Sequence, residues 1–200
     1  MTYLLKEKAS EIISLINDIP GVKNCTLYGS IAKDTYDELS DIDIEIDVSG
    51  MDNGLFMLKF SELLKDKMDI YYADYAPSLV PDKYIVSLAI DKDNPFLILD
   101  LCIVANPHCT TVTKEDVMDK NGKYTHTLKL WIANLKHYVR GNECLKDILK
   151  MTKKIGIEDA EDRKEAELLL ETLNYLEANV PSGLSEFVKS CRIVFDKVMK

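Results

Sequence analysis

The sequence lacks any Cys-x-x-Cys pair and any long apolar run. An odd number of scattered cysteines argues against a disulfide framework or a structural zinc site and favours reduced thiols. No apolar run approaches the ~18 residues of a membrane span, and Lys6, Glu7 and Lys8 place charge where a signal peptide would be apolar. We therefore expect a cytoplasmic protein that is neither exported nor membrane-spanning. The five cysteines are Cys25, Cys102, Cys109, Cys144 and Cys191.

Positive charge is scarce in the first half of the chain. Up to Thr110, nine lysines stand against 19 acidic side chains, a net charge of −10, whereas the remainder has 16 basic against 15 acidic side chains, a net charge of +1. Proteins that hold long nucleic acids need a positive surface that displaces counterions from phosphates. We therefore expect no long DNA or RNA partner. A metal ion or a small cationic substrate suits the acidic half better.

Glycine and proline are also few, with 8 and 6 residues among 200, so collagen-like and low-complexity structures are excluded. Residues 1–110 predict a mixed sheet flanked by helices, and residues 111–200 predict a helical bundle that completes a substrate cleft. The fold class is therefore α+β. The expected strands cover 22–28, 41–48, 68–72, 83–90 and 95–104, with the last two antiparallel; the expected helices cover 3–18, 55–67, 124–140, 143–154, 161–179 and 184–199.

The most informative stretch is Gly29-Ser30, a ten-residue spacer, and then Asp41-Ile42-Asp43. A glycine and a small hydroxyl residue after a strand allow backbone N–H groups to approach a phosphate closely. Two aspartates one residue apart on a strand point the same way, with α-carbons about 6.6 Å apart, which suits a shared divalent ion. The sequence therefore predicts a phosphate-binding turn beside a metal-binding pair.

A third carboxylate from another strand would complete a two-metal site. Asp100 is the favoured candidate because it lies inside an otherwise apolar run, where an unpaired charge is costly. Asp69, on the strand expected at 68–72, is the competing candidate. Glu45 and Asp47 continue the acidic face of the strand; simple solvation accounts for both, and Glu45 is the better candidate for orienting a substrate or acting as a base.

The pattern of Tyr28-Gly29-Ser30 followed by Asp41-Ile42-Asp43-Ile44 resembles the DNA polymerase beta-like nucleotidyltransferase superfamily. The length and the helical second half are similar to members that adenylylate aminoglycoside or lincosamide antibiotics. The resemblance implies magnesium-dependent transfer of a nucleoside monophosphate, AMP from ATP in the leading interpretation, onto a hydroxyl of a small molecule. Pyrophosphate is released.

The resemblance also implies a role for each matching residue. Asp41, Asp43 and Asp100 would be catalytic and would hold two Mg²⁺ ions, and Asp100 could assist deprotonation of the acceptor. Gly29 and Ser30 would hold the triphosphate of ATP or another nucleoside triphosphate. Lys33 stands near the position where the family commonly has arginine, and it keeps the charge but not the bidentate geometry.

Two other functions remain open at this point. The same fold could serve as a regulatory module, such as one member of a toxin–antitoxin pair that acts on a protein. Transfer onto RNA or protein is a third alternative, and the net charge of −9 disfavours the RNA version. The sequence leaves the acceptor and the oligomeric state open.

Overall fold

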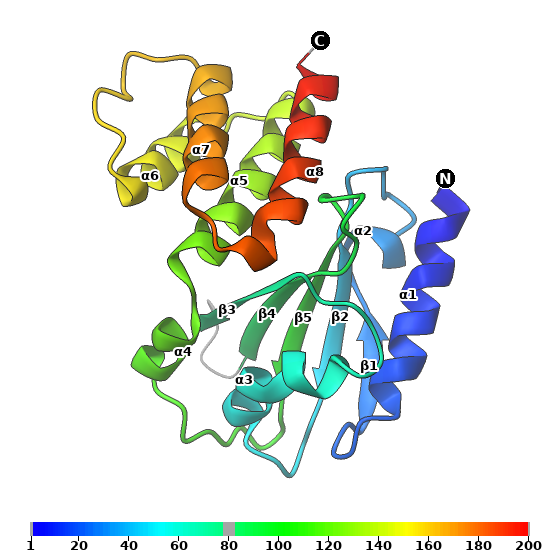
Figure 1. The fold of residues 1–200 in the computed structure, drawn as a ribbon. Coiled ribbons are helices and arrows are strands. Elements are labelled where there is room, and N and C mark those ends of the chain that lie inside the picture. Colours follow the sequence, from blue (N-terminus) through cyan, green and yellow to red (C-terminus); the bar gives the residue numbers. More distant parts are fainter. Residues whose placement is uncertain (1, 78–82, 200) are drawn as a thin grey trace. The chain divides into compact units, whose positions relative to one another are not determined.

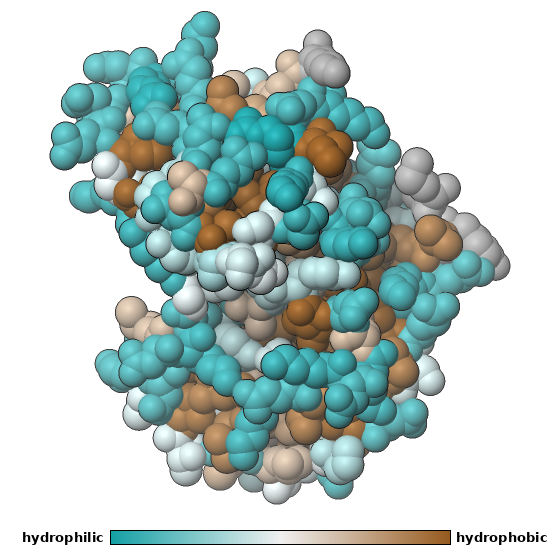
Figure 2. All heavy atoms as spheres, in the orientation of Figure 1, coloured by the Kyte–Doolittle hydropathy of each residue, from teal (hydrophilic) through white to brown (hydrophobic). Residues whose placement is uncertain are grey.

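The computed structural model describes residues 2–77 and 83–199. The chain divides into two compact units. The first comprises Met1–Asp91 and Leu97–Asn121, and the second comprises Lys92–Phe96 and Gly122–Lys200. Figure 2 shows polar side chains over much of the visible face of each unit.

The first unit is built on a mixed five-stranded sheet with the order β1-β2-β5-β4-β3 (Figure 1). Only β2 and β5 run parallel; the other neighbours are antiparallel. The predicted α+β class and the predicted antiparallel pair at 83–104 are confirmed. The strands are β1 (Asn24–Leu27), β2 (Ile42–Asp47), β3 (Tyr72–Pro77), β4 (Lys83–Ala89) and β5 (Ile98–Val104).

The alternating pattern of β2 separates an apolar face of the sheet from a polar one. Ile42, Ile44 and Ile46 are fully buried, whereas the acidic residues between them are half-buried. The isoleucines join a core with residues of α1 (Thr2–Asn17) and α3 (Asn53–Leu64). Because successive side chains on a strand point to opposite faces, the acidic side chains of β2 lie on the face away from this core.

The prediction of a third strand at residues 68–72 is wrong. β3 begins at Tyr72 and runs to Pro77. Residues 65–67 form a turn after α3, and the N–H groups of Lys67 and Met68 donate to the carbonyl of Leu64 at 2.9 and 3.0 Å. The sheet is reached only at Tyr71, whose N–H donates to the carbonyl of Ala89 on β4 at 2.9 Å.

Two short helices were not predicted. α2 (Gly29–Ala32) follows β1 directly and occupies the start of the predicted ten-residue spacer. α4 (Lys114–Lys120) belongs to the first unit and begins with a capping box between Thr113 and Asp116. That box was visible in the sequence as a threonine followed three residues later by an acid.

The second unit contains the four predicted helices. They are α5 (Lys123–Val139), α6 (Leu145–Ile155), α7 (Glu165–Asn179) and α8 (Ser182–Val198), and α7 begins four residues later than expected. Trp131 anchors their core: it is fully buried, its ring packs near Phe195, and its Nε1 donates to the carbonyl of Leu169 at 2.8 Å. None of the helices in the described part of the chain is long and apolar enough to cross a membrane.

Candidate active site

The turn after β1 holds the backbone directly against Asp43. The N–H of Tyr28 donates to the carbonyl of Asp43 at 3.0 Å, extending the β1–β2 pairing by one residue. Gly29 follows with φ +69°, and a Cβ built there would collide with the Asp43 carboxylate. Only glycine adopts this positive φ without strain and leaves room for the Asp43 carboxylate. Ser30 lies half-buried in the first turn of α2, and Lys33 is exposed at its end.

The sheet brings Asp43 and Asp100 together. They are register partners on the parallel strands β2 and β5, and both are half-buried. Neighbouring strands lie about 4.8 Å apart, so the two carboxylates stand side by side on the polar face. Asp41 lies two residues before Asp43, immediately ahead of β2, and is also half-buried. The three predicted carboxylates are thus neighbours.

Asp69 does not share this arrangement. It is exposed and lies in the segment before β3, outside the strand on which it was expected. In the strand order, β5 and β4 separate β3 from β2. The geometry therefore favours Asp100 over Asp69 as the neighbour of Asp43, while the catalytic role of Asp100 stays a prediction.

Ser87 is a site residue that sequence reasoning missed. It is fully buried on β4, pairs in register with Asp100, and its Oγ donates a hydrogen bond to Oδ1 of Asp100. Asp74 on β3 pairs in turn with Ser87 and is 1% exposed. Asp43, Asp100, Ser87 and Asp74 therefore form one row across four strands. In the sequence, Ser87 and Asp74 each stand among apolar or aromatic residues of an expected or observed strand, and this isolated polarity could have marked them as site residues.

Negatively charged side chains gather near Tyr28, which is 38% exposed. Burial first, and then the charges of Asp43, Cys102, Asp100 and Glu45, raise the pKa of its hydroxyl above its usual value. The phenol therefore stays protonated at neutral pH and can act only as a neutral donor or acceptor. A negative field attracts cations and calls for charge neutralisation before a triphosphate can approach.

The donor set fits a hard divalent cation in its chemistry. Carboxylate oxygens are the ligands that Mg²⁺ prefers, and three of them are available in Asp41, Asp43 and Asp100. Among residues 2–77 and 83–199, however, no group of three His, Cys, Asp or Glu side chains is already arranged to hold a metal ion. Asp100 instead accepts a hydrogen bond from Ser87.

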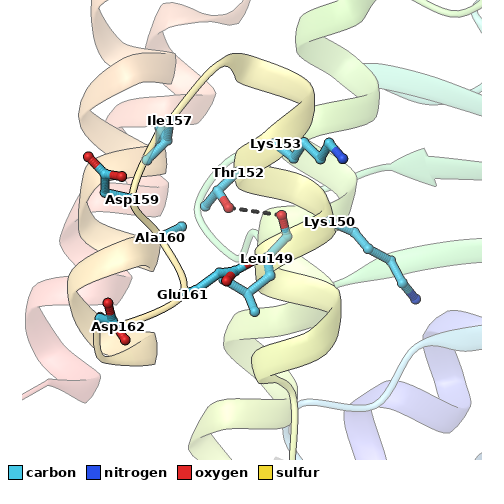
Figure 3. Close-up of a pocket in the computed structure, with 9 residues that line it drawn as sticks. All are labelled: Leu149, Lys150, Thr152, Lys153, Ile157, Asp159, Ala160, Glu161 and Asp162. Atoms are coloured by element: carbon cyan, nitrogen blue, oxygen red, sulfur yellow. Dashed lines mark hydrogen bonds between the residues drawn. The ribbon is translucent and has the colours of Figure 1, made fainter.

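A cavity of about 500 Å³ in the second unit contains none of the predicted site residues. It lies between α6 and the loop that leads to α7 (Figure 3). Thr152 Oγ1 donates to the carbonyl of Leu149 at 3.0 Å, so this hydroxyl closes a helical turn. The side chains of Lys150 and Lys153 point away from the acidic loop residues.

The comparison with protein families agrees with the geometry of the first unit. Residues 7–104 match the family model described as nucleotidyltransferase domain. The matched segment runs from within α1 to the end of β5, so Gly29, Asp43 and Asp100 all lie within it.

The nucleotidyltransferase domain supports a transferase activity in general. No curated protein matches the chain. The similarity to enzymes that modify aminoglycosides or lincosamides therefore stays a prediction, as do the donor nucleotide and the metal.

Proposed function

We propose that the chain is a magnesium-dependent nucleotidyltransferase that moves a nucleoside monophosphate, AMP from ATP in the leading form, onto a hydroxyl of a small molecule. The observation that carries this proposal is the pairing of Asp43 with Asp100 on parallel strands, with Gly29 held against Asp43. Acidic residues on neighbouring strands beside a tight glycine turn suit metal-assisted phosphoryl chemistry.

In this proposal Gly29, Ser30 and Lys33 bind the triphosphate, and Asp41, Asp43 and Asp100 hold two Mg²⁺ ions. Bound magnesium would neutralise the phosphate oxygens and lower the pKa of the acceptor hydroxyl. Ser87 donates to Oδ1 of Asp100, and because each carboxylate oxygen has two lone pairs, Asp100 could still ligate a cation or take the hydroxyl proton. The acceptor oxygen forms a bond to the α-phosphorus while the bond to the bridging oxygen of pyrophosphate breaks.

The acceptor in this proposal is a small hydroxylated molecule, neutral or cationic, because the residues up to Thr110 carry a net charge of −10. Aminoglycoside and lincosamide antibiotics are the first candidates. A long nucleic acid is disfavoured by the same charge.

The test is a screen of the four ribonucleoside triphosphates against aminoglycosides, lincosamides and other hydroxylated metabolites, with pyrophosphate release as the readout. We expect release that requires magnesium and that falls at least 100-fold in Asp43→Asn. Asp69→Asn, which removes an exposed carboxylate outside the sheet, is the matched control and should stay active. No magnesium-dependent release, together with no change in melting temperature on adding Mg-ATP, would instead favour a regulatory module acting on a protein.

A further inference from the structure

A cavity of about 510 Å³ opens on the first unit, on the polar face of the sheet. Its walls include Glu45 and Asp47, which follow Asp43 along the same face of β2. Thr26 and Asn24 on β1 are the register partners of these two acids. The volume lies within the range of ~300–1,000 Å³ that is typical of small-molecule sites. Lys83, at the start of β4, and Asn106, after β5, also line it.

The cavity lies at the opposite end of β2 from the glycine turn. β1 and β2 are antiparallel with Leu27 opposite Ile44, so Gly29 stands near the beginning of β2. Glu45 is one alternation step beyond Asp43, about 6.6 Å along the strand. In an in-line displacement the attacking oxygen enters opposite to the leaving group. If pyrophosphate leaves at Gly29 and Ser30, the acceptor would approach Asp43 from the end of β2 at which this cavity lies.

The lining can both donate and accept hydrogen bonds. Lys83 Nζ lies 3.0 Å from Glu45 Oε2, and both side chains remain about two-fifths exposed, so water or a ligand can reach the pair. Asp47 Oδ1 accepts from the N–H and the Oγ of Ser49 at 2.8 and 2.5 Å, which holds this carboxylate in one orientation. The amides of Asn24 and Asn106, the hydroxyls of Thr26 and Ser49 and the imidazole of His108 complete the polar set.

This chemistry selects against polyanions and against flat apolar molecules. The lining has two carboxylates, Glu45 and Asp47, and one ammonium group, that of Lys83. This ammonium group already forms an ion pair with Glu45. Hydroxyl groups suit such a lining because each one donates and accepts. A polyhydroxylated molecule that is neutral or carries amines therefore matches the lining.

We infer that this cavity is the acceptor subsite of the enzyme, that it takes a polyhydroxylated molecule, and that Glu45 orients that molecule toward Asp100. The inference rests on the proposed function, since it assumes that a nucleotide occupies the glycine turn. Glu45 acts here as a substrate-binding residue.

The binding test uses ¹⁵N-labelled protein saturated with Mg²⁺ and a non-hydrolysable ATP analogue. Kanamycin A, an amino polyol, sucrose, a neutral polyol, and spermine, a polyamine without hydroxyls, are each titrated while backbone amide signals are followed. Kanamycin A or sucrose should shift the amides of Thr26, Glu45 and Asn106. Shifts by spermine alone, or by none of the three, would overturn the inference.

The variant test compares Glu45→Gln with Glu62→Gln. Glu62 forms an exposed ion pair with Lys120 at 3.1 Å outside the cavity, so its variant controls for the loss of a surface ion pair. Glu45→Gln should weaken polyol binding at least tenfold and raise the acceptor KM to the same extent, with the KM for ATP changed less than twofold. Unchanged acceptor values in Glu45→Gln would overturn the subsite.

These outcomes separate the two proposals. If the ATP analogue with Mg²⁺ fails to bind the wild-type protein, the proposed function falls. If the analogue binds and transfer occurs, but neither polyol shifts the cavity amides, only the acceptor subsite falls.

Discussion

The hydroxyl of Ser87 donates to Oδ1 of Asp100 across the antiparallel strands β4 and β5. Ser87 is fully buried, so this bond is shielded from water and restricts the rotation of the Asp100 side chain. Asp100 is also the register partner of Asp43 on β2. A buried serine therefore positions a carboxylate that is proposed to bind metal.

Replacement of Ser87 should weaken the use of magnesium before it alters the fold. We expect Ser87→Ala to raise the Mg²⁺ concentration for half-maximal activity about tenfold, because a freely rotating Asp100 loses the equivalent of ~1.4 kcal/mol in metal binding. Ser87→Cys, which keeps a weak donor, should restore part of the affinity. A magnesium requirement unchanged in Ser87→Ala would contradict the positioning role. The measurement is a magnesium titration of pyrophosphate release.

Gly29→Ala should lower both the stability and the activity of the protein, because backbone strain and a steric collision add. The residue has φ +69°, and the added Cβ collides with the carboxylate of Asp43. Gly50→Ala is the matched control, since Gly50 has φ +93° and open space around its Cβ position. Urea unfolding should show a loss of about 1 kcal/mol for Gly50→Ala and about 2–3 kcal/mol for Gly29→Ala. Equal losses would mean that the contact with Asp43 contributes nothing.

Asp100→Asn and Asp69→Asn should separate a metal ligand from a surface acid. The amide introduced by Asp100→Asn keeps an oxygen that can accept from Ser87 but lacks the charge that repels Asp43. Turnover of Asp100→Asn should fall by at least 100-fold, while its melting temperature without magnesium stays equal to the wild-type value or rises. Asp69→Asn should match the wild type in both. An active Asp100→Asn beside an inactive Asp69→Asn would transfer the role to Asp69.

Sequence reasoning predicted well where the pattern is local. The alternation of β2 placed Asp43 and Glu45 on one polar face, and the helices of the second unit were found from their apolar spacing. Asp100 was singled out because its neighbours are apolar. Each of these inferences depends on residues within one element.

The remaining features of the site depend on which strands pair in the sheet. That Asp43 faces Asp100 follows from the parallel pairing of β2 with β5, which joins segments more than 50 residues apart. Ser87 and Asp74 enter the site only through the register of β3, β4 and β5, which a polar residue inside a strand segment does not reveal by itself. The error at 68–72 arose because an apolar segment after a helix does not reveal where the helical turn ends.

Asp52 should make stability depend on pH. It caps α3 by accepting from the N–H of Leu55 at 2.8 Å, and it also accepts from the N–H of Thr111 at 2.6 Å and from the hydroxyls of Thr111 and Thr110. Burial opposes the charge, but these hydrogen bonds outweigh it and lower the pKa of Asp52 below its usual 3.8. The stabilisation is therefore complete above about pH 4 and is lost as the pH falls through the lowered value.

Urea unfolding as a function of pH measures this contribution. Asp52→Asn should be less stable than the wild type by about 1–2 kcal/mol at pH 7, and the difference should shrink below about pH 4 as Asp52 becomes protonated. Asp66→Asn, at an exposed position after α3, is the control and should unfold like the wild type at every pH. A difference for Asp52→Asn that persists unchanged at about pH 2 would contradict the electrostatic account.

The most direct test of nucleotide transfer follows the phosphorus atoms of ATP. ATP labelled at the α-phosphate or at the γ-phosphate is incubated with magnesium, the enzyme and the acceptor found in the screen. The account predicts that the α-label appears on the acceptor and the γ-label in pyrophosphate, and that both products are lost in Asp43→Asn. Transfer of the γ-label to the acceptor, or transfer of the α-label that persists in Asp43→Asn, would contradict it.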